Sequence, residues 1–117
     1  MQPFSFEKLA EELRVFAEER DWQQFHAPKN LAMALIVEAA ELVEQFQWLS
    51  PEESERPDPD RRARIEAELA DILIYLVRLA DGLDIDLPAA VARKIEHNRQ
   101  KYPAAKVRGS RAKYDEY

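Results

Sequence analysis

The sequence predicts an all-α protein, a bundle of four helices followed by an extended C-terminal tail. Only two glycines occur in the 117 residues, Gly82 and Gly109, which argues against hairpins and folds rich in β-turns. Apolar residues recur at the three- and four-residue spacing of helices. The composition is 46% hydrophobic and 34% charged, as expected of a chain that folds. Its length suits one domain over residues 1–117.

The first two helices are marked by local start signals. A helix is expected over about residues 5–20, with Ser5 as its N-cap. The irregular, aromatic segment 21–30 follows it. Pro28 can open the second helix near its first turn, and apolar residues predict that this helix continues over about residues 29–48.

The second half of the chain has signals of the same kind. Residues 50–53, with the sequence SPEE, have the form of a capping box and predict a short helical turn. Residues 56–60 (RPDPD) indicate a surface linker. The third helix is expected over about residues 60–81, with Gly82 well placed to end it.

The C-terminal part should hold one more helix and then a tail. Asp86 is a candidate N-cap for a helix over about residues 87–101, which must stop before Pro103. Residues 104–117 lack hydrophobic periodicity, so we expect them to be extended or mobile.

The net charge of −6 is unevenly distributed. Residues 1–92 hold 20 acids and 9 bases, a balance of −11, whereas residues 93–117 hold 3 acids and 8 bases, a balance of +5. An acidic body does not suit a binder of nucleic acid polymers, whose phosphate contacts need a basic face. The basic segment suits either an anionic ligand or docking on a neighbouring subunit, and charge alone leaves both open.

Other features of the composition exclude further classes. The chain has no cysteine, which excludes disulfides, thiolate zinc sites and a cysteine nucleophile. No apolar run approaches the length of a transmembrane helix, and the N-terminus lacks a basic and then apolar signal peptide. We therefore expect a soluble, cytoplasmic protein that does not engage membranes.

Two of the predicted helices carry a pair of acids beside an apolar face. Glu38 and Glu41 lie about 60° apart on the second helix, and Glu68 and Asp71 repeat that arrangement on the third. If these helices pack together, four carboxylates can converge. Two like charges about 5 Å apart repel by about 3 kcal/mol at an effective dielectric near 20. The acids must then splay into water, take up protons or hold cations.

Hard oxygen ligands without cysteine or a nearby histidine favour Mg²⁺, with Mn²⁺ as a substitute. Two solvated helix edges that hold no metal remain an alternative explanation of the same spacing. A di-iron bundle would need Glu-x-x-His on two helices. The only histidines, His26 and His97, do not follow a suitable glutamate at that spacing, which disfavours iron.

Aromatic and basic side chains accompany the acids. Trp48 and Tyr75 fall on the same helical faces as the acid pairs and could stack on a flat base, although such residues also suit a core. Lys94, Asn98 and Lys101 form a stripe on the fourth helix. That stripe would either neutralise phosphates or form an exposed amphipathic face.

The acid pattern Glu38-x-x-Glu41, a gap of 26 residues and Glu68-x-x-Asp71 resembles the signature of the all-α nucleoside triphosphate pyrophosphohydrolases, the MazG-like superfamily. Longer segments look like its dCTP pyrophosphatase branch: RDWQQFHAPKNLAMALIVEAAELVEQFQW (20–48), AELADILIYLVRLA (67–80) and IDLPAAVARKIEHNRQKYP (85–103).

The resemblance implies an enzyme that hydrolyses a nucleoside triphosphate between the α and β phosphates to a monophosphate and pyrophosphate. It implies dCTP or a modified pyrimidine analogue as substrate, nucleotide pool cleansing as purpose, and assembly as a dimer or tetramer. The positions that match the Mg²⁺ ligands are Glu38, Glu41, Glu68 and Asp71, with Glu38 and Glu41 as candidate catalytic bases. The positions that match the nucleotide pocket are Trp22, His26, Trp48, Tyr75, Lys94, Asn98 and Tyr102.

One position departs from the pattern of this branch, which has a histidine nine residues before the tryptophan that matches Trp22. Here that position is Leu13, which removes a polar contact and leaves the base preference open. A second functional hypothesis is a catalytically silent helical assembly protein that has kept the fold. The substitution Glu41→Gln separates the two hypotheses, because only an enzyme would lose pyrophosphate release.

Overall fold

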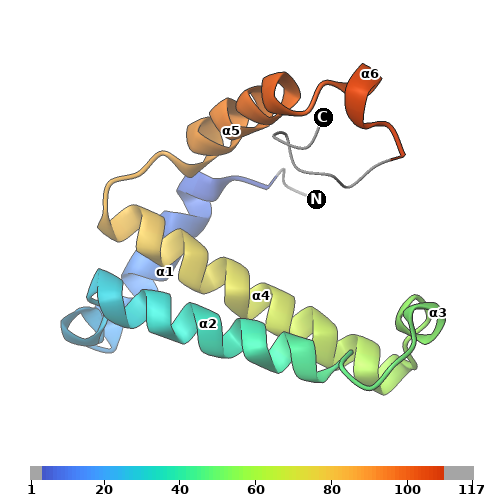
Figure 1. The fold of residues 1–117 in the computed structure, drawn as a ribbon. Helices are drawn as coiled ribbons and strands as arrows, with labels where there is room; N and C mark the ends of the chain where they lie inside the picture. The colour runs from blue at the N-terminus through green and yellow to red at the C-terminus, as the bar shows by residue number, and fades with distance from the viewer. Residues whose placement is uncertain (1–3, 110–117) are drawn as a thin grey trace. The chain divides into compact units, whose positions relative to one another are not determined.

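The protein is all-helical over the residues that the structure describes, as the sequence predicted. The computed structural model describes residues 4–109 (Figure 1). Its elements in chain order are α1 (Phe6–Glu19), η1 (Gln23–Phe25), α2 (Pro28–Glu44), α3 (Pro51–Ser54), α4 (Pro59–Gly82), α5 (Leu87–Lys101) and α6 (Ala104–Val107). The chain divides into two compact units after Asp84. Within the described range, no helix has the combination of length and apolarity that a membrane crossing requires.

The first unit is built on the antiparallel helices α2 and α4, which lie side by side along most of their lengths (Figure 1). Helix α1 packs against the part of α4 that approaches its C-terminus. The buried apolar side chains among the described residues come from these three helices and are Ala17, Leu31, Val77 and Ala80. Because this core is small, it removes little apolar area from water. Much of the apolar surface of α2 stays exposed.

Side-chain caps begin the helices where the sequence predicted them. Ser5 accepts a backbone N–H at the start of α1, and Asp86 does the same for α5. Ser50 and Glu53 form the expected capping box: the Ser50 hydroxyl accepts the Glu53 N–H at 3.1 Å, and the Glu53 carboxylate accepts the Ser50 N–H at 2.9 Å. These contacts satisfy N–H donors that have no partner within the helix itself.

The predicted continuation of the second helix to residue 48 is wrong, because α2 ends at Glu44. The Gln45 carbonyl accepts a hydrogen bond from the Arg61 guanidinium of α4. The Leu49 N–H donates to the carbonyl of residue 46 and not to that of Gln45. The chain leaves the α-helical pattern before this point, because the N–H groups of Gln45 and Phe46 donate to carbonyls three residues back and not four. Trp48 therefore does not share the helical register of Glu41.

The third predicted helix ends where expected, because Gly82 is the last residue of α4, and the positive φ that follows, 55°, belongs to Asp84. Aspartate adopts this left-handed conformation more readily than most residues do. Residues 104–107, expected to be extended or mobile, form the one-turn helix α6. Residues 110–117 of the predicted tail lie outside the described residues.

Candidate metal and nucleotide site

Three of the four predicted acids come together where α2 and α4 pack. Glu38, Glu41 and Glu68 each offer one carboxylate oxygen, and these oxygens lie within 4.8 Å of one another. Glu38 and Glu41 lie almost one turn apart on α2, so they share a face. Glu68 comes from α4. The packing of the two helices, and not either helix alone, therefore forms this glutamate cluster.

The glutamate cluster holds carboxylate oxygens that the protein does not satisfy. One oxygen each of Glu38 and Glu68, the Oε2 atom, is buried without a hydrogen-bond partner in the described part of the chain. The carboxyl group of Glu68 raises the pKa of Glu38, and burial and the charge of Asp71 act in the same direction. Glu38 in turn raises the pKa of Glu41. A shared proton relieves such a group in part, and a hard cation bound to the oxygens relieves it more fully, so the residues fit a metal site.

Asp71, the fourth predicted acid, contributes no oxygen to the group of oxygens that lie within 4.8 Å of one another. It follows Glu68 by three residues on α4, and its negative charge raises the pKa of Glu38. Its side chain lines a neighbouring cavity of about 210 Å³. Asp71 thus connects the glutamate cluster to this cavity.

The cavity is lined mainly by aromatic and apolar side chains. Its walls are formed by α1, the segment around η1 and α4, through Leu13, Phe16, Ala17, Trp22, His26, Asp71, Ile74, Tyr75 and Arg78. Three of the residues predicted for a nucleotide pocket, Trp22, His26 and Tyr75, are therefore brought together. The Trp22 ring lies edge-on to those of Phe16 and His26, with centroid distances of 5.7 and 6.3 Å. Flat apolar walls with a few polar groups suit a planar ligand.

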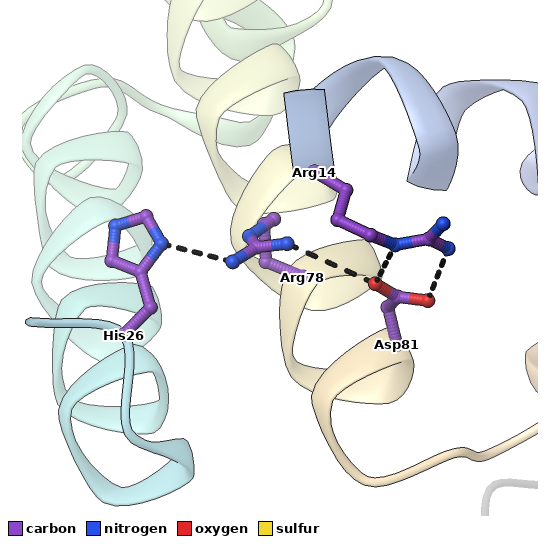
Figure 2. Close-up of polar contacts among 4 residues, drawn as sticks. All are labelled: Arg14, His26, Arg78 and Asp81. Atoms are coloured by element: carbon purple, nitrogen blue, oxygen red, sulfur yellow. Dashed lines mark hydrogen bonds and ion pairs between the residues drawn. The ribbon is translucent and has the colours of Figure 1, made fainter. Parts of the chain in front are cut away.

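A chain of polar contacts leads from the cavity to α1, as Figure 2 shows. His26 Nδ1 lies 3.2 Å from Arg78 Nη2, and Arg78 Nη1 lies 3.8 Å from the Asp81 carboxylate. Arg14 of α1 donates two hydrogen bonds, of 3.0 and 3.1 Å, to the same carboxylate and so lowers the pKa of Asp81. Burial, and then the charge of Arg78, lower the pKa of His26. His26 is therefore neutral near pH 7, and its Nδ1 can accept the Arg78 proton.

Three residues of this chain of contacts were not predicted from the sequence: Arg14, Arg78 and Asp81. No motif marks them, because Arg14 and Asp81 are 67 residues apart and meet only when α1 packs on α4. Arg78 lies seven residues after Asp71 and therefore on the same face of α4. This spacing was the signal that could have identified Arg78 from the sequence.

Four further residues were predicted for the site. Trp48 lies beyond the end of α2 with 87% of its surface exposed. Lys94 and Asn98 lie about one turn apart on α5 of the second unit, and Tyr102 is the C-cap of that helix. Their role in a nucleotide site stays a prediction.

The predicted acid pairs fall in a segment that matches a known protein family. The profile of the MazG-like family matches residues 33–117, which include all four predicted acids. The chain belongs to the MazG-like family, and the resemblance inferred from the acid spacing is confirmed.

Individual relatives narrow the match to one branch. The chain is 49% identical to dCTP pyrophosphatase 1 of Rattus norvegicus, over 96% of this chain and 71% of that protein. Identity to the human protein of the same name is 47%, over 97% of this chain and 70% of that protein. The crystal structure of a pyrophosphatase from Archaeoglobus fulgidus is similar with a TM-score of 0.80 and 42% identity, over 88% of this chain and 96% of that one. The predicted dCTP pyrophosphatase branch is thereby confirmed.

Proposed function

We propose that this chain is a Mg²⁺-dependent pyrophosphohydrolase that converts dCTP, or a modified pyrimidine analogue, to the nucleoside monophosphate and pyrophosphate. The observation that carries the proposal is the glutamate cluster, with two buried and unpartnered oxygens, beside an aromatic cavity. The printed names of the relatives, dCTP pyrophosphatase 1, support the choice of reaction and base. Removal of a damaged or unwanted nucleotide from the pool would be its purpose.

Glu38, Glu41 and Glu68 would hold the metal, and the family pattern adds Asp71 as a fourth ligand. Mg²⁺ is the proposed ion because every donor is a hard carboxylate oxygen, and Mn²⁺ accepts the same ligands. When bound, such an ion neutralises the charge on the phosphate oxygens.

The side chains around the cavity would bind and orient the nucleotide. Trp22 and Tyr75 supply flat walls for the base, and Asp71 marks the side of the cavity that faces the glutamate cluster. Glu38 and Glu41 are the carboxylates proposed to take a proton from the attacking water. Either glutamate suits this role.

The remaining predicted residues are proposed as further contacts of the nucleotide. Lys94, Asn98 and Tyr102 offer an ammonium, an amide and a hydroxyl group, which suit the phosphate and sugar oxygens. Trp48 would add a further aromatic surface for the base.

We also propose that the chain functions as a homo-oligomer, a dimer or a tetramer. Helix α2 exposes apolar side chains at three-, four- and seven-residue spacings, with exposed fractions of 54–67%: Met33, Ile36, Val37 and Val43. Soluble monomers rarely expose a contiguous apolar face, and a second copy would cover it. Sedimentation equilibrium tests this: Ile36→Arg should shift the mass toward the monomer, and a monomeric wild type would contradict the proposal.

The primary test is pyrophosphate release from dCTP, dUTP, dGTP and dATP, with Mg²⁺ and with a chelator. We expect metal-dependent release that is fastest for dCTP. Glu41→Gln should abolish it. Glu44→Gln is the matched control, because Glu44 is exposed on the same helix and lies outside the glutamate cluster. Wild-type release by Glu41→Gln would contradict the metal assignment. No release by the wild-type chain would favour the silent assembly protein.

A further inference from the structure

Among the described residues that line the cavity, Arg78 is the one lysine or arginine. Its side chain is only 11% exposed. It follows Asp71 by seven residues and Tyr75 by three on α4, so the three side chains share one face of that helix. Because His26 is neutral, Arg78 carries the positive charge of the cavity wall.

The Arg78 guanidinium has unused hydrogen-bond donors. An arginine has five N–H groups, and among the described residues only Nη2 has a hydrogen-bond partner, His26 Nδ1 at 3.2 Å. The 3.8 Å separation from Asp81 is an ion pair and is too long for a hydrogen bond. The Nε atom is buried without a partner.

Neighbouring residues position this guanidinium but do not neutralise its charge. Arg14 makes two hydrogen bonds with Asp81, so the carboxylate is already paired (Figure 2). His26 contacts Arg78 through a ring nitrogen that carries no charge. A positively charged, planar group with free donors is thus fixed in the cavity wall, which is the arrangement of a recognition residue.

We propose that Arg78 is a specificity-determining residue that binds two adjacent hydrogen-bond acceptors of the base, N3 and O2 of cytosine; this rests on the proposed function. The fork of a guanidinium matches two neighbouring acceptors. Cytosine presents N3 and O2 side by side on one edge. Uracil and thymine carry a proton on N3, so that edge offers no such pair.

The place of Arg78 in the cavity favours the base over the phosphates. Seven residues of helix separate Arg78 from Asp71, a rise of about 10 Å. That is comparable to the length of a nucleotide from its α-phosphate to the far edge of its base. If the phosphates lie at the glutamate cluster, the base edge reaches Arg78 after passing Tyr75.

Leu13 also lines this cavity. It is the position at which the sequence departs from the pattern of the branch, and it offers no polar contact to a base. Arg78 supplies a polar group from α4 in the same cavity, so the loss at Leu13 does not leave the base without a hydrogen-bonding partner.

The test compares substrates in Arg78→Gln. We expect kcat/KM for dCTP to fall about 5- to 150-fold, the range expected for loss of a bidentate contact to a base. The value for dUTP should change by no more than about twofold, because dUTP never formed that contact. 5-Methyl-dCTP should follow dCTP, since C5 lies across the ring from N3 and O2. Arg78→Lys keeps the charge but not the fork, and should recover little of the loss.

Arg62→Gln is the matched control, because Arg62 is an exposed arginine of the same helix α4 and does not line the cavity. Its ratio of kcat/KM for dCTP over dUTP should equal that of the wild type. An equal loss on dCTP and dUTP in Arg78→Gln would overturn the inference, since a structural or phosphate-binding role predicts it. A loss confined to dGTP, which has its own adjacent acceptors N7 and O6, would also overturn it.

A binding measurement separates this inference from the proposed reaction and does not depend on one variant. dCMP and dUMP are titrated into the full chain without metal, and binding is followed by isothermal titration calorimetry. The wild type should prefer dCMP, and Arg78→Lys should lose that preference while keeping the wild-type circular dichroism spectrum. If the wild type prefers dCMP but releases no pyrophosphate, the proposed reaction is rejected and the role of Arg78 is not. Equal binding of the two monophosphates by the wild type would reject the role of Arg78.

Discussion

Replacing Glu68 with glutamine tests the electrostatics of the glutamate cluster directly. The substitution removes one charge and keeps the shape of the side chain. The ligand oxygens of Glu38 and Glu68 lie no more than 4.8 Å apart, and two full charges at that separation repel by about 3.5 kcal/mol at an effective dielectric of 20. Solvent screening and proton sharing relieve part of this repulsion. We therefore expect the metal-free variant to be more stable than the wild type by about 1–2 kcal/mol.

The assay is thermal unfolding followed by circular dichroism, in chelator and in Mg²⁺, at one protein concentration. For a domain of this size, about 1–2 kcal/mol corresponds to a rise in Tm of about 4–8 °C. Saturating Mg²⁺ should stabilise the wild type by about 2.7 kcal/mol at one hundred times its Kd. It should stabilise Glu68→Gln much less, and pyrophosphate release from dCTP should be lost.

Three results would refute this reasoning. A metal-free Glu68→Gln that is less stable than the wild type would show that the cluster is not strained by repulsion. Equal stabilisation of both proteins by Mg²⁺ would show that the metal lies elsewhere. The pH dependence gives a third check. Because the pKa of Glu38 is raised in the folded protein, the folded state binds the proton more tightly, and the metal-free wild type should lose stability as pH rises from about 4.5. A metal-free stability that rises over that range would contradict the raised pKa.

Three further predictions concern stability. Leu31→Ala should lower the free energy of unfolding by about 2–5 kcal/mol in urea, because Leu31 is 2% exposed and its removal leaves a cavity; a loss below about 1 kcal/mol would show that the site collapses. Arg14 lowers the pKa of Asp81, so this carboxylate adds stability above its usual pKa near 3.8 that disappears as pH falls through the lowered value. In urea unfolding, the stability of Asp81→Asn should fall less at acid pH than that of the wild type. An equal fall in both proteins would contradict the contact. Ser50→Ala should cost about 1 kcal/mol of unfolding free energy by removing the cap of α3, and an unchanged Tm would show that the cap is dispensable.

Local signals were sufficient for most of the helix boundaries. The caps at Ser5, Ser50 and Asp86 act within three residues of sequence, so their residue types alone predict them. The end of α2 could not be predicted in this way. Just beyond Glu44, the N–H groups of Gln45 and Phe46 donate three residues back instead of four, and the Gln45 carbonyl accepts a hydrogen bond from Arg61 of a different helix.

The same distinction holds at the candidate site. Each acid pair is recognisable because residues three apart share a helical face. The sequence did not indicate that Asp71 would face the cavity while Glu38, Glu41 and Glu68 approach one another.

By itself, the sequence determined the all-α class, the capped helix starts, the two acid pairs and the family, since each depends on residue types at short spacing. Only the tertiary structure decided which carboxylates meet and which arginine enters the cavity. Both depend on how α1 and α2 pack against α4, and the distances between side chains of different helices follow from that packing, which local spacing does not encode. Arg14 and Asp81, joined across 67 residues, are the clearest example.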